Sequence, residues 1–141
     1  MDNISDKKDF SIVGFLLRLP IGILFFFAGL NKFIDGYGNF VSWIMKDMTE
    51  NTWLPAFVLY PYAHILPFIE VTVGVLLIIG LFTRSTLFIT ALLLTSLMFG
   101  KVLTHDYATS ANNANYVFMT ALAFYFSRYN CISVDKFIRK S

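Results

Sequence analysis

The sequence predicts an all-α integral membrane protein, a four-helix antiparallel bundle with an interfacial segment between its first two helices. Of its 141 residues, 57% are hydrophobic and 14% are charged, whereas soluble domains carry roughly 25% charged residues. Four apolar stretches approach or exceed the length needed to cross a hydrocarbon core of about 30 Å at about 1.5 Å per residue. The chain length of 141 residues predicts a single domain over residues 1–141.

The first predicted span covers about residues 12–33 and contains Pro20. A proline is tolerated there because neighbouring helices satisfy the carbonyl that it leaves free. A cleaved signal peptide is the competing interpretation, since Lys7 and Lys8 would form its basic region. The apolar run is too long and lacks a small-residue cleavage site, so we expect an uncleaved anchor.

The other three spans are predicted at about residues 62–82, 86–103 and 113–129. Three residues separate the second span from the third, so these two must form an antiparallel hairpin. The connection over residues 34–61 mixes aromatic and aliphatic side chains with polar ones. That mixture is typical of a segment that lies in the membrane interface.

The basic residues are distributed unequally between the two sides of the predicted bundle. One side carries both termini and eight of the eleven Lys and Arg residues: Lys7, Lys8, Arg18, Arg84, Arg128, Lys136, Arg139 and Lys140. Because cytoplasmic loops are enriched in Lys and Arg, both termini are predicted to be cytoplasmic. At the C-terminus, Ser133 is predicted to cap a short helix that lies on the same surface.

Two predicted spans contain a charged residue at membrane depth, Arg18 in the first and Glu70 in the second. Such a residue costs roughly 2.5 to 3.5 kcal/mol unless it faces the bundle interior and finds a partner. We therefore expect Arg18 and Glu70 to form a buried pair. The pair would fix helix register, or Glu70 would carry a proton or bind a ligand headgroup. In a third interpretation, Arg18 extends to the inner interface instead.

A second polar cluster is predicted at the outer ends of the spans. Its ligand-binding candidates are Lys32, His64, Lys101 and Asn115, which lie above Glu70. Two lysines and an amide suit an anionic or quinone-like headgroup. A metal site is not expected, because the two histidines lie on separate segments without a metal-ligand spacing.

Several classes of function are disfavoured. Cys131 is the single cysteine, and a thiol relay requires two. A net charge of +2 without basic clusters does not indicate a nucleic-acid partner. The sequence contains no phosphate-binding loop or nucleophile elbow, so no catalytic residue is assigned.

The first span resembles the opening signature of the DoxX family of small membrane proteins over the run FLLRLPIGILFFFAGLNKF, which includes Arg18 and an A-G-x-x-K element ending at Lys32. The run IEVTVGVLLIIGLFTR is similar to that family's second-span signature, with Glu70 and Arg84 in the expected order. The ending SVD at residues 133–135 is similar to its C-terminal tail.

The resemblance implies a four-helix membrane bundle associated with redox enzymes, since the family includes the small subunit of thiosulfate:quinone oxidoreductase. We therefore expect a subunit of the bacterial inner membrane that supports a redox partner protein and binds a quinone or membrane lipid within its bundle. Arg84 would be its cytoplasmic anchor, and no covalent cofactor is implied. The alternatives are a non-catalytic scaffold or assembly factor, which would have only protein partners, and then a small-solute transporter. A homo-oligomer is compatible with all of these functions.

Overall fold

The computed structural model describes residues 4–129 and 133–135, and this part of the chain is all-α, as predicted. Its helices are α1 (Ile4–Ile34), α2 (Tyr37–Asn51), α3 (Ala56–Ile79), α4 (Thr83–Leu103), α5 (Tyr107–Phe126) and the 3-10 helix η1 (Ser127–Tyr129). Most of α1 and the whole of α3 and α4 are long and apolar enough to cross a membrane. The fold is therefore an integral membrane helix bundle.

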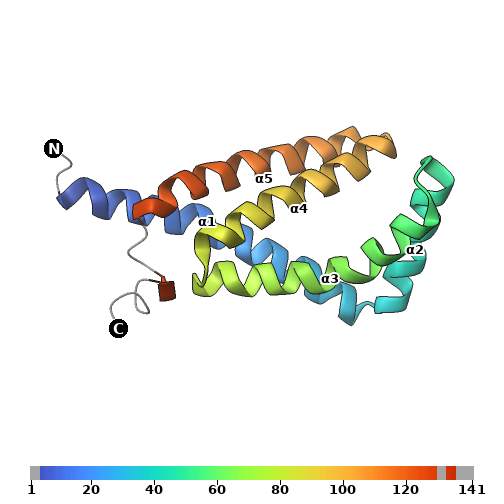
Figure 1. The fold of residues 1–141 in the computed structure, drawn as a ribbon, viewed down its shortest axis with the longest axis horizontal. Coiled ribbons are helices and arrows are strands. Elements are labelled where there is room, and N and C mark those ends of the chain that lie inside the picture. The colour runs from blue at the N-terminus through green and yellow to red at the C-terminus, as the bar shows by residue number, and fades with distance from the viewer. Residues whose placement is uncertain (1–3, 130–132, 136–141) are drawn as a thin grey trace.

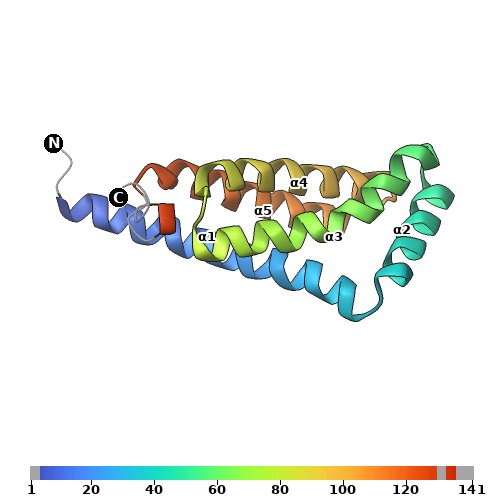
Figure 2. The ribbon, with the colours of Figure 1, turned by 60° about the horizontal axis from the view of Figure 1, so that its bottom comes forward.

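The four long helices are arranged as two packed pairs. The main partner of α1 is α3, and the main partner of α4 is α5; α1 also packs against α5. The start of α1, the α3–α4 turn and η1 lie at one end of the bundle, and α2 and the α4–α5 turn lie at the other (Figures 1 and 2). This alternation matches the predicted antiparallel topology.

Glycines allow α1 and α3 to approach each other closely. A Cβ atom at Gly74 would lie 2.4 Å from the backbone nitrogen of Phe26, and one at Gly29 would lie 2.8 Å from that of Val71. Small residues at a membrane helix interface permit such backbone contact. The seam also buries Ile21 and Leu77, so it holds the two helices in a defined register.

All four long helices begin earlier than the predicted spans, and the difference is six residues for both α3 and α5. Helix α3 begins at Ala56 rather than near residue 62 and continues through Pro61. A proline has no backbone N–H to donate. The hydrogen bond that is lost at Pro61 would have been made to a carbonyl in the first turn of α3. Helix α5 begins at Tyr107 rather than near residue 113 because Asp106 caps it, accepting the Thr109 N–H at 3.1 Å. The polar residues of its first two turns concealed this start.

The predicted interfacial connection contains a helix, α2. Its Val41, Ile44 and Met48 are buried, and their spacing of three and four places them on one helical face. Gly36, with φ +106°, begins the helix, and extended backbone at Thr52 ends it. The sequence indicated an amphipathic segment here, and the structure shows that it packs mainly against α3.

Residues 133–135 lie against the α3–α4 turn. The two carboxylate oxygens of Asp135 accept the backbone N–H groups of Phe82 and Thr83 at 2.6 and 2.7 Å. Its own N–H donates to the Gly80 carbonyl at 3.2 Å. A carboxylate at a helix N-terminus satisfies donors that have no partner within the helix, so Asp135 caps α4. The predicted helix after Ser133 extends beyond the described residues.

Candidate functional site

A cavity of about 420 Å³ lies where α2 crosses the ends of the other helices. We call it the α2 cavity, after the helix that forms one of its walls. Apolar side chains from α2, α3 and α4 make up much of its lining, including Phe40, Trp43, Leu59 and Leu97. Its polar lining residues are Lys32, Asp47, Tyr62, Glu70, Ser96, Lys101, Thr109 and Asn113. A largely apolar pocket with a few convergent polar groups is typical of a ligand site.

The cavity contains an ion pair between Lys32, in the last turn of α1, and Glu70, in the middle of α3. Lys32 Nζ donates to Glu70 Oε2. The Glu70 side chain is 3% exposed and that of Lys32 is 21% exposed. A buried carboxylate is tolerated in this environment because it has a charged, hydrogen-bonded partner. Lys32, and not the predicted Arg18, is therefore the partner of Glu70.

The predicted pair between Arg18 and Glu70 was wrong. Arg18 is 2% exposed, and its Nη1 donates to Thr83 Oγ1 at 3.3 Å, at the α3–α4 turn. Thr83 lies beyond the C-terminal end of α3, at least roughly 13 Å along the helix from Glu70. The Asp135 carboxylate lies close enough to act electrostatically on Arg18.

The direction in which helical side chains point explains why Arg18 contacts Thr83 and Lys32 contacts Glu70. Each Cα–Cβ bond in a helix tilts toward the N-terminus, and α1 starts at the end of the bundle that holds the α3–α4 turn (Figure 1). Arg18 therefore points toward that turn and away from Glu70. Lys32 starts from the opposite end and points back toward the bundle centre, where it reaches the carboxylate.

Both lysines of the cavity also contact aromatic rings of α2. Lys32 Nζ lies 5.1 Å from the ring centroid of Phe40, and Lys101 Nζ lies 5.5 Å from that of Trp43. A cation within about 6 Å of an aromatic face is attracted to it. These two contacts link α2 to α1 and α4 across the cavity.

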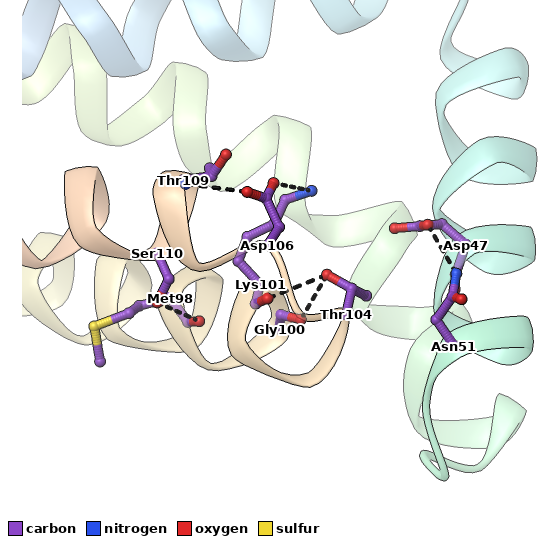
Figure 3. A network of polar contacts seen from close by, with 9 residues as sticks. All are labelled: Asp47, Asn51, Met98, Gly100, Lys101, Thr104, Asp106, Thr109 and Ser110. Carbon is purple, nitrogen blue, oxygen red and sulfur yellow. Dashed lines mark hydrogen bonds and ion pairs between the residues drawn. The ribbon is translucent and has the colours of Figure 1, made fainter.

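Lys101 also forms an ion pair at 3.6 Å with Asp106 at the α4–α5 turn (Figure 3). Hydrogen bonds from Thr109, and then the charge of Lys101, lower the pKa of Asp106. The carboxylate therefore stays ionised and keeps Lys101 near the cavity rim. This pair is partly exposed, so it orients the lysine more than it stabilises the fold.

A hydrogen bond joins α3 and α4 across the cavity wall. Tyr62 Oη lies 3.1 Å from Ser96 Oγ, and Ser96 Oγ donates to the Leu93 carbonyl at 2.7 Å. A serine hydroxyl has a single hydrogen, so Tyr62 must be the donor to Ser96. Because its one hydrogen is used in this bond, the Tyr62 oxygen can only accept a further hydrogen bond.

The structure brings together three of the five predicted ligand-binding residues, Lys32, Glu70 and Lys101. His64 does not line the cavity; its Nδ1 lies 2.8 Å from the Tyr60 carbonyl oxygen and its ring packs against Tyr60 and Tyr37. Asn115 is exposed on α5. Binding by the three residues in the cavity remains a prediction.

Five polar residues of the cavity were not among the predicted ligand-binding candidates: Asp47, Tyr62, Ser96, Thr109 and Asn113. A signal for Tyr62 was present, because it lies eight residues before Glu70 and hence on the same helical face. Asn113 lies two residues before Asn115, the predicted candidate. The two residues lie on different faces of α5, and only Asn113 lines the cavity. No signal in the sequence indicated Ser96.

Arg84 lies in the first turn of α4, beside the α3–α4 turn. Its guanidinium carbon is 5.0 Å from the ring centroid of Phe124 on α5. This position at the end of the bundle fits an interfacial anchor. Its placement on the cytoplasmic side remains a prediction.

A comparison with protein families matches residues 13–106 to the DoxX family. No curated protein and no solved structure matches the chain. The matched region includes the ion pair of Lys32 and Glu70, the whole of α2, and Lys101. It ends at Asp106, so the whole of α5, including Asn113, lies outside it.

Proposed function

Because the chain belongs to the DoxX family, we propose that it is a membrane subunit that supports a redox partner protein and binds a quinone in the α2 cavity. DoxX proteins form a membrane family often linked to redox enzymes. The observation that carries the proposal is the ion pair of the partly buried Lys32 and the buried Glu70 inside a largely apolar cavity. The helices around it include three that are apolar enough to span a membrane.

A quinone ring matches the chemistry of this cavity. The ring is apolar and planar, and its two carbonyl oxygens require hydrogen-bond donors. Lys32 and Lys101 supply N–H donors, while Phe40, Trp43 and Leu97 supply apolar contact. Reduction of a quinone consumes two electrons and two protons. The partner protein would supply the electrons. The two protons would come from water and pass through the Glu70 carboxylate one at a time, so that the carboxylate is regenerated after each transfer.

Tryptophan fluorescence tests this proposal, because Trp43 lines the cavity and Trp53 does not. In the Trp53→Phe variant, a decyl benzoquinone should quench Trp43 in a saturable way. In the matched Trp43→Phe variant, quenching of Trp53 should rise in proportion to the quinone in the membrane, without saturation. Saturable quenching in neither variant would favour the scaffold function instead.

The Lys101→Met substitution in the Trp53→Phe background tests the role of the lysine. A hydrogen bond to a charged group contributes about 1.5 kcal/mol, and about 1.4 kcal/mol corresponds to a tenfold change in affinity. The variant should therefore raise the dissociation constant roughly tenfold. An unchanged dissociation constant would show that Lys101 does not contribute to quinone binding.

We also propose that the protein lies in the bacterial inner membrane with both termini in the cytoplasm. The proposal rests on the eight of eleven basic residues on the side that carries the termini. The end of the bundle with α2 and the α4–α5 turn would then face outward.

Cysteine labelling in a Cys131→Ser background tests this orientation. A Cβ at Gly38, on α2, would meet no atom within 4 Å, so a cysteine there should be tolerated. It should react with a membrane-impermeant thiol reagent in intact cells. The control Ser85→Cys, at an exposed position on the first turn of α4, should react only in opened cells. The reverse labelling pattern would show that the protein has the opposite orientation in the membrane.

A further inference from the structure

Exposed apolar side chains on both α3 and α4 line the α2 cavity. Two of its lining residues are exposed apolar side chains on these helices, Val58 at 46% and Phe99 at 50%. Val58 lies four residues before Tyr62, and Phe99 lies three residues after Ser96. Because α3 and α4 are antiparallel, both lie about one turn beyond the Tyr62–Ser96 hydrogen bond, in the same direction. They therefore flank the cavity where that bond no longer joins the two helices.

The surface between Val58 and Phe99 is suited to contact with membrane hydrocarbon. Val58 and Phe99 belong to helices apolar enough to span a bilayer, and their exposed surfaces are apolar. The charged lining groups come from other positions, with Lys32 at the end of α1 and Lys101 beside Asp106 at the α4–α5 turn. The cavity thus has charged lining groups at one set of positions and exposed apolar lining groups at another.

We propose that the cavity opens between Val58 and Phe99, and that this opening is a portal through which the hydrocarbon tail of the ligand extends into the membrane while its headgroup stays near Lys32 and Glu70. This inference rests on the proposed function and specifies its ligand as a tailed, membrane-resident quinone. A volume of about 420 Å³ lies toward the lower end of the roughly 300 to 1,000 Å³ of small-molecule pockets. It holds a substituted ring but not a long isoprenoid chain, so the chain must leave the cavity.

The test compares two ligands that share a dimethoxy-methyl-benzoquinone ring, one with a decyl tail and one without. The full-length Trp53→Phe protein is reconstituted in phospholipid vesicles, and quenching of Trp43 reports binding. Val58→Phe narrows the portal and should raise the dissociation constant of the decyl ligand at least fivefold. The constant of the tailless ring should change less than twofold. Comparing each ligand with itself between variants cancels its partition into the membrane.

Two further variants serve as controls. Ile65 lies on α3, is 53% exposed and does not line the cavity, so Ile65→Phe should leave both dissociation constants unchanged. Val58→Ala widens the portal and should bind the decyl ligand at least as tightly as the parent.

The outcomes separate the portal from the proposed function. Equal effects of Val58→Phe on both ligands, or none on the decyl ligand, would overturn the portal while leaving the quinone site intact. Weaker binding of the decyl ligand to Val58→Ala would also overturn it. Failure of both ligands to quench Trp43 saturably in the parent would overturn the proposed function and the portal together.

Discussion

Substitution of Lys32 by Met is expected to lower the free energy of unfolding by about 3 to 5 kcal/mol, the cost of removing one partner of a buried ion pair. The change leaves the Glu70 carboxylate, which is 3% exposed, without its cation. Glu70→Leu should cost less, because the long Lys32 side chain can move its ammonium group toward the interface. The double variant should lose less stability than the sum of the two single variants. Unfolding in mixed detergent micelles measures these differences.

Two controls make this cycle decisive. Lys46→Met removes an exposed lysine of α2 and should change stability by about 0.5 kcal/mol or less. Arg18→Leu combined with Glu70→Leu should give additive losses, because the two side chains lie at different levels of the bundle. Additivity for Lys32 and Glu70 would show that they do not interact, and coupling between Arg18 and Glu70 would contradict the observed partners.

Gly74→Ala is expected to destabilise the bundle by about 2 to 3 kcal/mol through overpacking. The added Cβ would lie 2.4 Å from the nitrogen and 2.6 Å from the Cα of Phe26. These are backbone atoms, so the clash cannot be relieved by a side-chain rotation and α1 must move away from α3. The same unfolding measurement gives the effect.

Gly38→Ala is the matched control for this prediction. A Cβ there meets no atom within 4 Å, and replacing a helical glycine by alanine typically stabilises by about 0.5 to 1 kcal/mol. The two substitutions add the same methyl group, so their difference reports the α1–α3 contact. Similar effects at both positions would mean that these helices do not pack closely in the membrane.

The two charged residues at membrane depth show where sequence reasoning reached its limit. Because a charged side chain has a high free energy in lipid, Arg18 and Glu70 were predicted to face the bundle interior. This prediction is confirmed, since both are 2% exposed. Their pairing depended on depths counted from approximate span ends and on an assumed reach of the arginine side chain. The true span of α3 begins six residues earlier than the predicted one, and the tilt of the side chains separates the two residues further.

The candidate site shows the same limit. Lys32 and Lys101 were recognised because charges near span ends are few, whereas His64 and Asn115 were included only for their depth. Depth does not determine the direction in which a side chain points around the helix axis. The neighbouring helix decides this direction, which is why Asn113 and not Asn115 lines the cavity.

By itself the sequence determined the all-α class, the antiparallel membrane bundle and the mixed apolar and polar character of residues 34–61, because these follow from local apolar length, charge and periodicity. Only the tertiary structure decided that Lys32 is the partner of Glu70, that Asp135 caps α4 and that α2 forms a wall of the cavity. The first two contacts join residues 38 and 52 positions apart along the chain, and the contact of Trp43 with Lys101 across the cavity joins residues 58 positions apart. They depend on the axial offset and rotation of whole helices, which close packing at glycines such as Gly29 and Gly74 sets.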